Sequence, residues 1–339
     1  MLAATVHSDS AKPLVSLSYW SVVESVLTDN GIQQDWMQTH PGLALARETG
    51  RLRCQDYESL LLLSLKAFGP TLGVETGLRG YPTKHGALGI GLMSCATLGQ
   101  ALAFGVRYQH ARMPYYDVQA HSESPWLHID VYERIELPGL RHFGITSACT
   151  EICTLLRTLA PIHPDQLRLF FDMPEPPYFA SYRDRLPSCT FGSPVNRVAI
   201  RLDALNLRLP SANAQALREA SEQCQAELVR LGIAGSWREQ VLVRLQDPHQ
   251  VPRTIGQMAT ALHVSDRTLK RHLQREGCTF KTLQDTVRMR AARALLADPG
   301  LAIADIAQQV GFDDPAHFTR AFKRWTGQPP SALRTPTQI

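Results

Sequence analysis

One sequence pattern occurs twice near the C-terminal end of the chain, in residues 254–277 and again in residues 302–327. In each copy, apolar residues recur at i, i+3 and i+4, and a second segment with apolar and basic residues follows after a short break. The matching residues are Ile255, Met258 and Ala259 in the first copy, and Ile303, Ile306 and Ala307 in the second. Two copies of one unit predict a repeated supersecondary structure.

Each copy has the pattern of a helix, a tight turn and a second helix. Gly311 supplies the conformational freedom of the turn in the second copy. Ser265 in the first copy and Asp313 or Asp314 in the second are suited to cap the second helix. That helix has one apolar and one basic side; the basic residues are Arg267, Lys270, Arg271 and Arg275 in one copy and Arg320, Lys323 and Arg324 in the other. The pattern predicts two helix-turn-helix units, whose second helices enter the major groove of DNA.

The charge distribution supports a polyanionic partner for this region alone. The chain has 339 residues and a net charge of +4. Residues 236–339 hold 15 Lys and Arg against 9 Asp and Glu, which leaves 20 against 22 in residues 1–235. A basic module of charge +6 therefore follows a body of charge −2, and the asymmetry favours double-stranded DNA as the partner of the module.

The length and the patterning predict a mixed α+β N-terminal ligand-sensing domain in residues 1–210. An all-α C-terminal domain with two helix-turn-helix motifs follows in residues 236–339. Helices are expected at 19–31, 56–68, 97–110 and 144–159, and strands at 115–120, 126–133, 166–171 and 197–202. The uncharged stretch 86–106 contains several Gly, Ser and Thr residues, so we expect a buried strand followed by a helix from Thr97, and no membrane span.

A linker helix is expected in the segment 211–235. Leu217, Cys224, Leu228 and Leu231 recur there at helical spacing. This apolar stripe is able to pack on the chain's own body or to form a coiled seam with a second subunit, which would make the protein a homodimer.

Catalytic motifs are absent from the sequence. There is no HExxH, GxxxxGK[ST], GxSxG or paired Cys/His spacing, so we expect no enzyme activity, no cofactor and no metal site. His121, Glu123 and His128 lie close in sequence, and the simplest interpretation is that they are solvated polar residues. Cys149 and Cys153 fall in an apolar helical run and are interpreted as buried small hydrophobic residues. The scattered cysteines and the N-terminal residues, which lack a signal-peptide pattern, favour a cytoplasmic protein.

Basic residues flank the uncharged stretch of the body. Arg79, Lys84 and Arg107, with Arg112, are candidates to bind the anionic head group of a ligand, although solvated positions are the simpler expectation. The apolar interior of the body favours a ligand with a substantial apolar part, such as a fatty acid, and an amino-acid derivative is the alternative.

Residues 254–334 resemble the DNA-binding domain of the AraC/XylS family of bacterial transcription regulators. The resemblance includes both helix-turn-helix units, a connecting helix at 280–296, the Gly311-Phe312 turn and the closing TGQPPS segment at 326–331. The segments 88–108 and 191–213 resemble the arabinose-binding-type N-terminal domain of the branch that includes ToxT-like and ornithine-utilisation-type regulators. Membership implies a DNA-binding regulator, usually an activator that acts with RNA polymerase and is often dimeric, whose N-terminal domain senses a small molecule.

The resemblance also implies which side chains face DNA. The groove-facing positions are Arg267, Lys270 and Arg271 in the first recognition helix, and Ala316, His317 and Arg320 in the second. Ala316 departs from the polar residue that is common at its position and offers only a methyl contact. The first helix is therefore expected to read more of the sequence. Contacts to phosphates are expected from Lys281, Arg288, Lys323 and Arg324.

Three alternatives remain open at this point, and one is a pure interaction protein whose basic repeat binds a partner. The regulator could be controlled by its abundance or by a protein partner, without a small-molecule ligand. An enzyme domain fused to a DNA-binding module is the third alternative, and the missing catalytic motifs argue against it.

Overall fold

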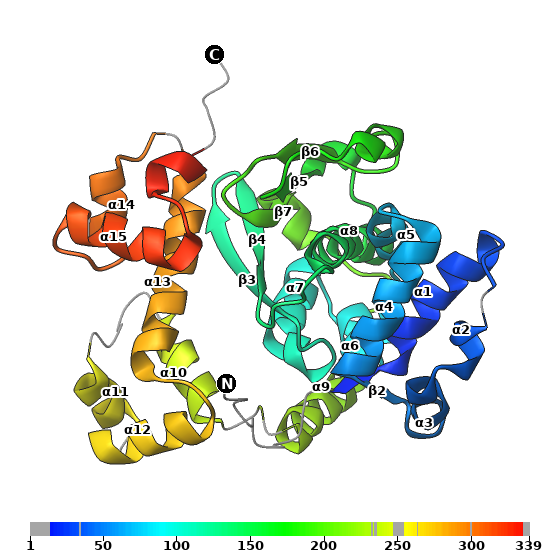
Figure 1. The fold of residues 1–339 in the computed structure, drawn as a ribbon, viewed down its shortest axis with the longest axis horizontal. Helices are drawn as coiled ribbons and strands as arrows, with labels where there is room; N and C mark the ends of the chain where they lie inside the picture. The colour runs from blue at the N-terminus through cyan, green and yellow to red at the C-terminus, as the bar shows by residue number, and fades with distance from the viewer. Residues whose placement is uncertain are drawn as a thin grey trace, which may run out of the picture. The chain divides into compact units, whose positions relative to one another are not determined.

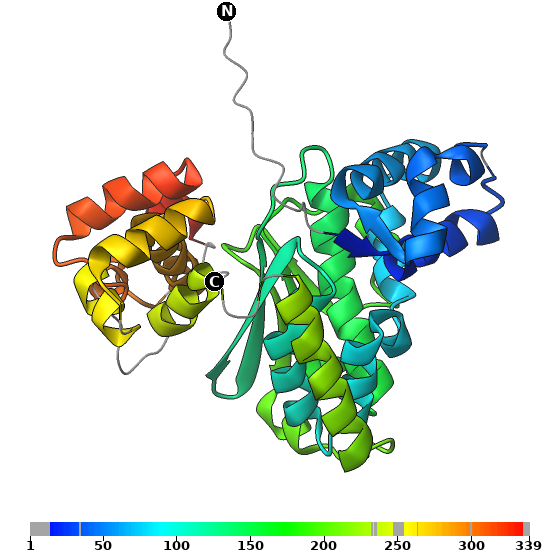
Figure 2. The same ribbon diagram turned by 90° about the horizontal axis from the view of Figure 1, so that it is seen from below.

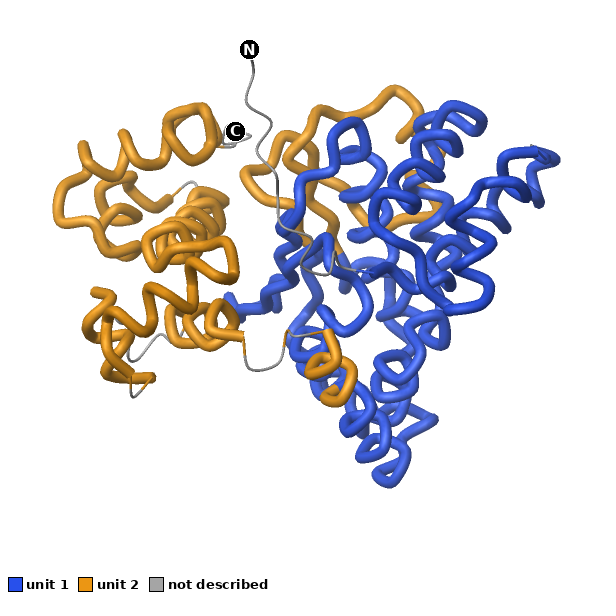
Figure 3. The backbone as a smooth tube through the Cα atoms, turned by 60° about the horizontal axis from the view of Figure 1, so that its bottom comes forward, with its two compact units in different colours: residues 1–167, 198–224 blue, residues 168–197, 225–339 orange. Residues whose placement is uncertain are grey.

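The computed structural model describes residues 14–334, except 34, 232, 234–235, 247–253, 263 and 299. The N-terminal residues 1–13, on which the expected absence of a signal peptide partly depends, lie outside the described range. The chain divides into two compact units, residues 1–167 with 198–224 and residues 168–197 with 225–339 (Figure 3). Each unit is described separately.

Unit 1 is mostly helical. Its helices are α1 (Leu17–Asp29), α2 (Trp36–Thr39), α3 (Pro41–Thr49), α4 (Cys54–Phe68), α5 (Leu72–Leu78), α6 (Ala87–Ser94), α7 (Leu98–Tyr108) and α8 (Arg141–Leu159). Short 3-10 helices lie at Pro82–His85, Gln109–Ala111, Pro164–Gln166 and Leu202–Asn206. The expected helices α1, α4, α7 and α8 are present. α7 starts next to Thr97, as predicted, and Thr97 caps it by accepting a hydrogen bond from the backbone N–H of Gln100.

The strands form two sheets. A small antiparallel sheet pairs β1 (Leu14–Ser16) with β2 (Arg51–Arg53). The larger sheet has the order β3-β4-β7-β5-β6, from β3 (Tyr116–Glu123), β4 (Trp126–Glu133), β7 (Asn196–Arg201), β5 (Leu167–Phe171) and β6 (Ser188–Phe191). β3 and β4 are an antiparallel hairpin, whereas β5 and β6 are parallel. Strand β7 begins in unit 2 and continues into unit 1. The mixed α and β content confirms the predicted fold class of the N-terminal part.

The prediction of a buried strand before Thr97 is wrong. Residues 87–94 form the helix α6. The segment is apolar on every side, so its sequence carries no period that would separate a short buried helix from a strand. No helix among the described residues is long and apolar enough to cross a membrane.

Helices α5 and α8 pack against each other at unusually close range. A Cβ atom on Gly73 would lie 2.7 Å from the carbonyl oxygen of Phe143, and one on Gly77 would lie 2.7 Å from that of Ser147. Any side chain at these two positions would separate the helices. The close approach extends to Gly80, just after α5, where a Cβ atom would lie 2.9 Å from Glu151 Cγ in the middle of α8.

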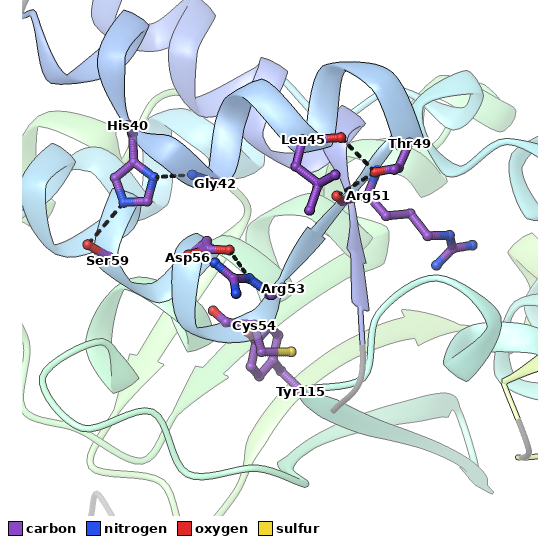
Figure 4. Close-up of polar contacts among 10 residues, drawn as sticks. All are labelled: His40, Gly42, Leu45, Thr49, Arg51, Arg53, Cys54, Asp56, Ser59 and Tyr115. Atoms are coloured by element: carbon purple, nitrogen blue, oxygen red, sulfur yellow. Dashed lines mark hydrogen bonds and ion pairs between the residues drawn. The ribbon is translucent and has the colours of Figure 1, made fainter. Parts of the chain in front are cut away.

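Polar contacts fix the start of α4 (Figure 4). Arg53 Nε donates to Asp56 Oδ2 at 2.6 Å, and the guanidinium bonds the other carboxylate oxygen at 3.1 Å. His40 caps α3, and its ring also lies 3.4 Å from the hydroxyl of Ser59 in α4. The Tyr115 hydroxyl donates to the carbonyl oxygen of Cys54 at 3.4 Å, which joins α4 to the segment that leads into β3.

The predicted linker helix is α9 (Ala214–Arg230). It buries Ala220 and Cys224 within the chain, and Ser221 shares a hydrogen bond of 2.8 Å with Tyr108 of α7. Figure 2 shows the yellow-green α9 alongside the teal α7. The helix therefore packs on its own body, the first of the two alternatives. The second alternative, a seam between α9 and a second subunit, stays a prediction.

The C-terminal part of unit 2 is all helical, as predicted. It contains α10 (Trp237–Leu245), α11 (Ile255–Ala261), α12 (Asp266–Arg275), α13 (Phe280–Leu296), α14 (Ile303–Gln309) and α15 (Pro315–Thr326). Figure 1 shows α11 and α12 at one end of α13, and α14 and α15 at the other. Each end of α13 belongs to a separate hydrophobic core. One core contains Met258, Leu269 and Leu273, and the other contains Phe318 and Phe322. The repeat in the sequence thus corresponds to two structural units.

Candidate nucleic-acid interface and ligand cavity

The first recognition helix, α12, presents a basic face to solvent. Ser265 caps the helix by accepting a hydrogen bond from the backbone N–H of Thr268 at 3.2 Å. Leu269 and Leu273 are buried in the hydrophobic core of the first helix-turn-helix. Because these two residues fix the rotation of the helix, the side chains predicted to face the groove are all exposed; they are Arg267, Lys270 and Arg271.

The second recognition helix, α15, repeats this arrangement. Asp314 is the cap, accepting from the backbone N–H of Ala316 at 2.8 Å, and Pro315 occupies the first helical position. Of the two caps that the sequence allowed, the structure selects Asp314. Phe318 and Phe322 are buried, whereas the candidate base-reading residues are exposed; they are His317 and Arg320. The preceding turn uses Gly311 at φ +83°, a conformation that side chains disfavour.

The connecting helix separates the two recognition helices. α13 has 17 residues, which corresponds to about 25 Å at the rise of an α-helix. One turn of DNA is roughly 34 Å long. A spacer of this length, with a helix-turn-helix unit packed at each end, is suited to place the two recognition helices in successive major grooves.

A hollow of about 600 Å³ brings several candidate DNA-binding residues together. Its lining includes the predicted phosphate-binding residues Lys281, Arg288 and Arg324 and the predicted base-reading residues His317 and Arg320. The guanidinium of Arg288 lies over the ring of Phe312, and Arg324 lies 3.4 Å from Asp285. Arg267, Lys270, Arg271 and Lys323 do not line this hollow.

Most of the exposed cations on the two recognition helices are available to an anionic partner. Within the described ranges, no carboxylate forms an ion pair with Arg267, Lys270, Arg271 or Arg320. A solvated arginine keeps its planar set of donors, which matches the O6 and N7 atoms of guanine. The geometry of the region is thus that of a polyanion-binding face.

The sequence did not predict α10 or its attachment to α12. The carboxylate of Glu276 accepts hydrogen bonds from the backbone N–H groups of Trp237 (2.9 Å) and Arg238 (2.7 Å). The Trp237 ring stacks on His272, with ring centroids 4.5 Å apart. A carboxylate at the N-terminus of a helix satisfies donors that have no partner within the helix. α10 thereby holds the C-terminal end of the first recognition helix in place.

Unit 1 contains a cavity of about 200 Å³. Its walls are mostly apolar side chains from α4, α6, α7, β3, β4 and α8, such as Leu61, Leu88, Leu92, Val106, Val131 and Leu156. The exceptions include four polar side chains that are linked by contacts, Tyr19, Lys84, His85 and Glu151, and also Thr76. A mostly apolar cavity with a few converging polar groups is typical of a small-molecule site.

The polar end of the cavity is a buried charged cluster. Lys84 Nζ and His85 Nε2 both contact the same carboxylate oxygen of Glu151, the latter at 2.9 Å. The Tyr19 hydroxyl shares a hydrogen bond of 2.8 Å with the other ring nitrogen of His85. Burial alone would raise the pKa of Glu151, but Lys84 and His85 outweigh it and lower that pKa to about 2, so the carboxylate is ionised. Burial raises the pKa of Tyr19, which keeps its proton.

Of the three ligand-binding candidates, Lys84 alone lines the cavity. It is 3% exposed, so the expectation of a solvated position is wrong for this residue. Arg79 lies outside the cavity lining and pairs with Asp29. Arg107 is exposed, with its guanidinium 5.2 Å from the ring centroid of Tyr108. Sequence reasoning missed Glu151, although a carboxylate inside an apolar helix is a signal that a buried cationic partner is present.

The β3–β4 hairpin brings together the polar residues that the sequence placed near one another. His121 lies directly opposite His128, and one ligand atom from each of His121, Glu123 and His128 lies within 4.8 Å of the others. Such spacing is compatible with a metal ion as well as with solvated side chains. The interpretation as solvated residues stays a prediction. Cys149 and Cys153 are buried, as expected.

Two family models match the chain. The arabinose-binding domain of AraC transcription regulators, N-terminal, matches residues 41–209, which include much of the cavity. A helix-turn-helix domain matches residues 258–335, which include both recognition helices.

Several transcription regulators are similar to all or part of the chain. The ornithine utilization regulator of Pseudomonas aeruginosa is 27% identical over 95% of this chain and 96% of its own length. The regulator VqsM of the same organism is 33% identical over 38% of this chain and 41% of its own. The crystal structure of the regulator CdpR from P. aeruginosa aligns with 98% of this chain and 99% of its own, at 22% identity and a TM-score of 0.46. The chain belongs to the AraC/XylS family of transcription regulators, with an arabinose-binding-type N-terminal domain and a DNA-binding helix-turn-helix region.

Proposed function

We propose that this DNA-binding regulator activates transcription in response to a small molecule held in the cavity of unit 1. The observation that carries the proposal is the cavity itself, because its lining combines apolar walls with a buried charged end. A core built only for stability is usually close-packed and avoids buried ion pairs that hydrophobic residues could replace. Most of the cavity lining lies in the region that matches the arabinose-binding domain family, which supports the same conclusion.

The DNA-binding roles of individual residues are part of this proposal. Arg267, Lys270 and Arg271 read base edges from α12, and His317 and Arg320 read them from α15. Their exposure and the buried opposite faces of both helices support the assignment. Phosphate contacts come from Lys281, Arg288, Lys323 and Arg324, which position the protein without specifying sequence.

The remaining partners follow from the proposed role. An activator acts on RNA polymerase in the cytoplasm, and two copies of the chain would bind as a homodimer. The packing of Ala220 and Cys224 within the chain leaves other faces of α9 exposed, including Val229 at 61%. That exposed residue is a place to probe dimer formation, by sedimentation of the wild type and of Val229→Asp.

A cavity-filling variant tests control by a small molecule. Ala148 lines the cavity, so Ala148→Phe fills part of it, whereas Ala103 is exposed on α7 and Ala103→Phe is the matched control. We expect Ala148→Phe to bind the operator as the wild type does but to lose the response of a reporter gene to growth conditions. A response that is unchanged in Ala148→Phe would show that abundance or a protein partner controls the regulator.

A further inference from the structure

The β3–β4 hairpin has an apolar face and a polar face. Side chains of a strand alternate between the two faces of its sheet. Val118 of β3 and Ile129 of β4 line the cavity of unit 1. His121 and Glu123 of β3 therefore point away from the cavity, and so does His128 of β4, which lies directly opposite His121. Two imidazoles and one carboxylate are thus gathered on a face that the cavity does not use.

The three side chains lie within reach of one metal ion. One ligand atom from each lies within 4.8 Å of the others. The centroids of the two imidazole rings are 5.2 Å apart, and His128 Nδ1 lies 3.8 Å from Glu123 Oε2. Ligand atoms that surround a tetrahedral zinc ion at roughly 2.1 Å are about 3.4 Å from one another. Side-chain rotation therefore has to bring the ligand atoms closer by at most about 1.4 Å, starting from 4.8 Å.

The exposure of the side chains allows this movement. The side chain of Glu123 is 61% exposed and that of His121 is 42% exposed, so both rotate without disturbing the core. The side chain of His128 is largely covered, which keeps one ligand close to its present position. The hairpin also holds the backbone of both strands in register, so little backbone entropy is lost when a metal ion binds.

A buried carboxylate lies next to His121. Asp130, two residues after His128 on β4, is buried, and its Oδ2 atom lies 3.8 Å from His121 Nδ1. The hydroxyl of Tyr132 donates to the same oxygen at 3.2 Å, which holds the carboxylate in place. A carboxylate beside a metal-binding histidine orients its ring and makes the imidazole a better ligand. Asp130 is placed for that role, and it adds a second carboxylate to a region that would hold a cation.

We propose that His121, Glu123 and His128 bind a divalent transition-metal ion, with Zn²⁺ as the ion that fits best, and that Asp130 positions His121. Imidazole nitrogen and carboxylate oxygen are both zinc ligands, and three protein ligands leave a fourth position for water. Mg²⁺ prefers sites built from oxygen atoms, so it fits less well. This proposal replaces the interpretation of the three residues as solvated side chains. It does not depend on control by a small molecule, because the cavity lies on the other face of the hairpin.

Zinc titration of the full-length protein tests the site. The protein is purified without a histidine tag and kept reduced. Calorimetry is expected to show one zinc ion bound to the hairpin with a dissociation constant of about 10 µM or lower, and much weaker binding of Mg²⁺. No zinc binding up to roughly 100 µM, or equally tight binding of Mg²⁺, would overturn the proposal.

Variants on the polar face separate this site from other zinc ligands in the chain. His121→Gln and Glu123→Gln change exposed side chains, so both variants should keep the fold, which circular dichroism checks. We expect each to weaken zinc binding at least about tenfold. His163→Gln is the matched control, because His163 is an exposed histidine whose ring lies 3.3 Å from Asp165, outside the hairpin. Equal zinc binding by His121→Gln and the wild type, or an equal loss in His163→Gln, would contradict the assignment.

Cobalt reports on the ligand atoms directly. Bound Co²⁺ should give the visible absorption of a four-coordinate site without the near-ultraviolet absorption of thiolate ligands, because none of the assigned ligands is a cysteine. A thiolate band would place the metal on cysteines and overturn the proposal. Asp130→Asn should keep the visible band and weaken binding about tenfold. If the folded Asp130→Asn variant binds zinc like the wild type, Asp130 does not position His121.

Discussion

His85 Nε2 lies 2.9 Å from Glu151 Oε1, the same oxygen that Lys84 contacts. One carboxylate therefore holds two bases at the end of an otherwise apolar cavity. Glu151 can occupy this position because α5 and α8 approach closely through Gly73 and Gly77, and Gly80 leaves room for its side chain. The polar end of the cavity thus depends on the packing of two helices.

Replacing Glu151 by Gln is expected to destabilise the protein strongly at neutral pH. The variant leaves Lys84 buried without its ionised partner, which costs about 3–5 kcal/mol. The pKa of Glu151 drops from its ordinary value of 4.5 to about 2 on folding, so its contribution is fully present above about pH 4.5 and is lost as the pH falls toward 2. The gap in free energy of unfolding between wild type and variant should therefore narrow over that window.

Urea unfolding of the wild type and Glu151→Gln at a series of pH values measures this gap. Glu48→Gln, an exposed change on α3, is the control and should unfold like the wild type. A gap that stays constant from neutral pH to pH 2 would show that the carboxylate is not ionised in the folded protein.

Gly77→Ala is expected to separate α5 from α8. The added Cβ would lie 2.7 Å from both the Ser147 carbonyl oxygen and Thr150 Cβ. Overpacking of this kind costs about 1–3 kcal/mol. Gly105→Ala, in α7, meets only the flexible end of Leu92 at 3.3 Å and is the matched control. Thermal unfolding should show a lower melting temperature for Gly77→Ala alone; equal melting temperatures would mean that the helices are not packed this closely.

Lys281→Ala is expected to weaken binding to all DNA sequences to a similar extent. A phosphate contact releases counterions, so its loss should reduce the slope of log affinity against log salt by about 1. Gel-shift titrations at several salt concentrations, on the operator and on unrelated DNA, measure both quantities. Lys66→Ala, an exposed change on α4, should behave like the wild type. A loss confined to the operator would instead assign Lys281 to base reading.

The helix-turn-helix region was predictable because its sequence signals are local and strong. The apolar period, the caps at Ser265 and Asp314 and the glycine at 311 all indicate the same elements. The assignment of side chains to bases or phosphates goes beyond these signals, because it depends on the DNA.

The cavity of unit 1 was less predictable because its residues come from distant segments. Lys84 and Glu151 are separated by 67 positions and meet only through the packing of α5 on α8. α6 was mistaken for a strand because its apolar residues show no helical period. The sequence indicates Lys84 as a candidate ligand residue but does not separate it from Arg79 and Arg107. The three residues differ in burial, because Lys84 is buried and the two arginines are not.

We propose that one chain reads two successive major grooves with two unequal recognition helices. The most direct measurement is a selection of bound sequences from random DNA by the wild type, Arg271→Ala and Arg320→Ala. We predict two preferred blocks about 10 base pairs apart for the wild type. Arg271→Ala should erase preference in one block, at a cost of about 1–3 kcal/mol, and Arg320→Ala in the other. If either variant abolishes both blocks, or neither variant changes any block, the claim is contradicted.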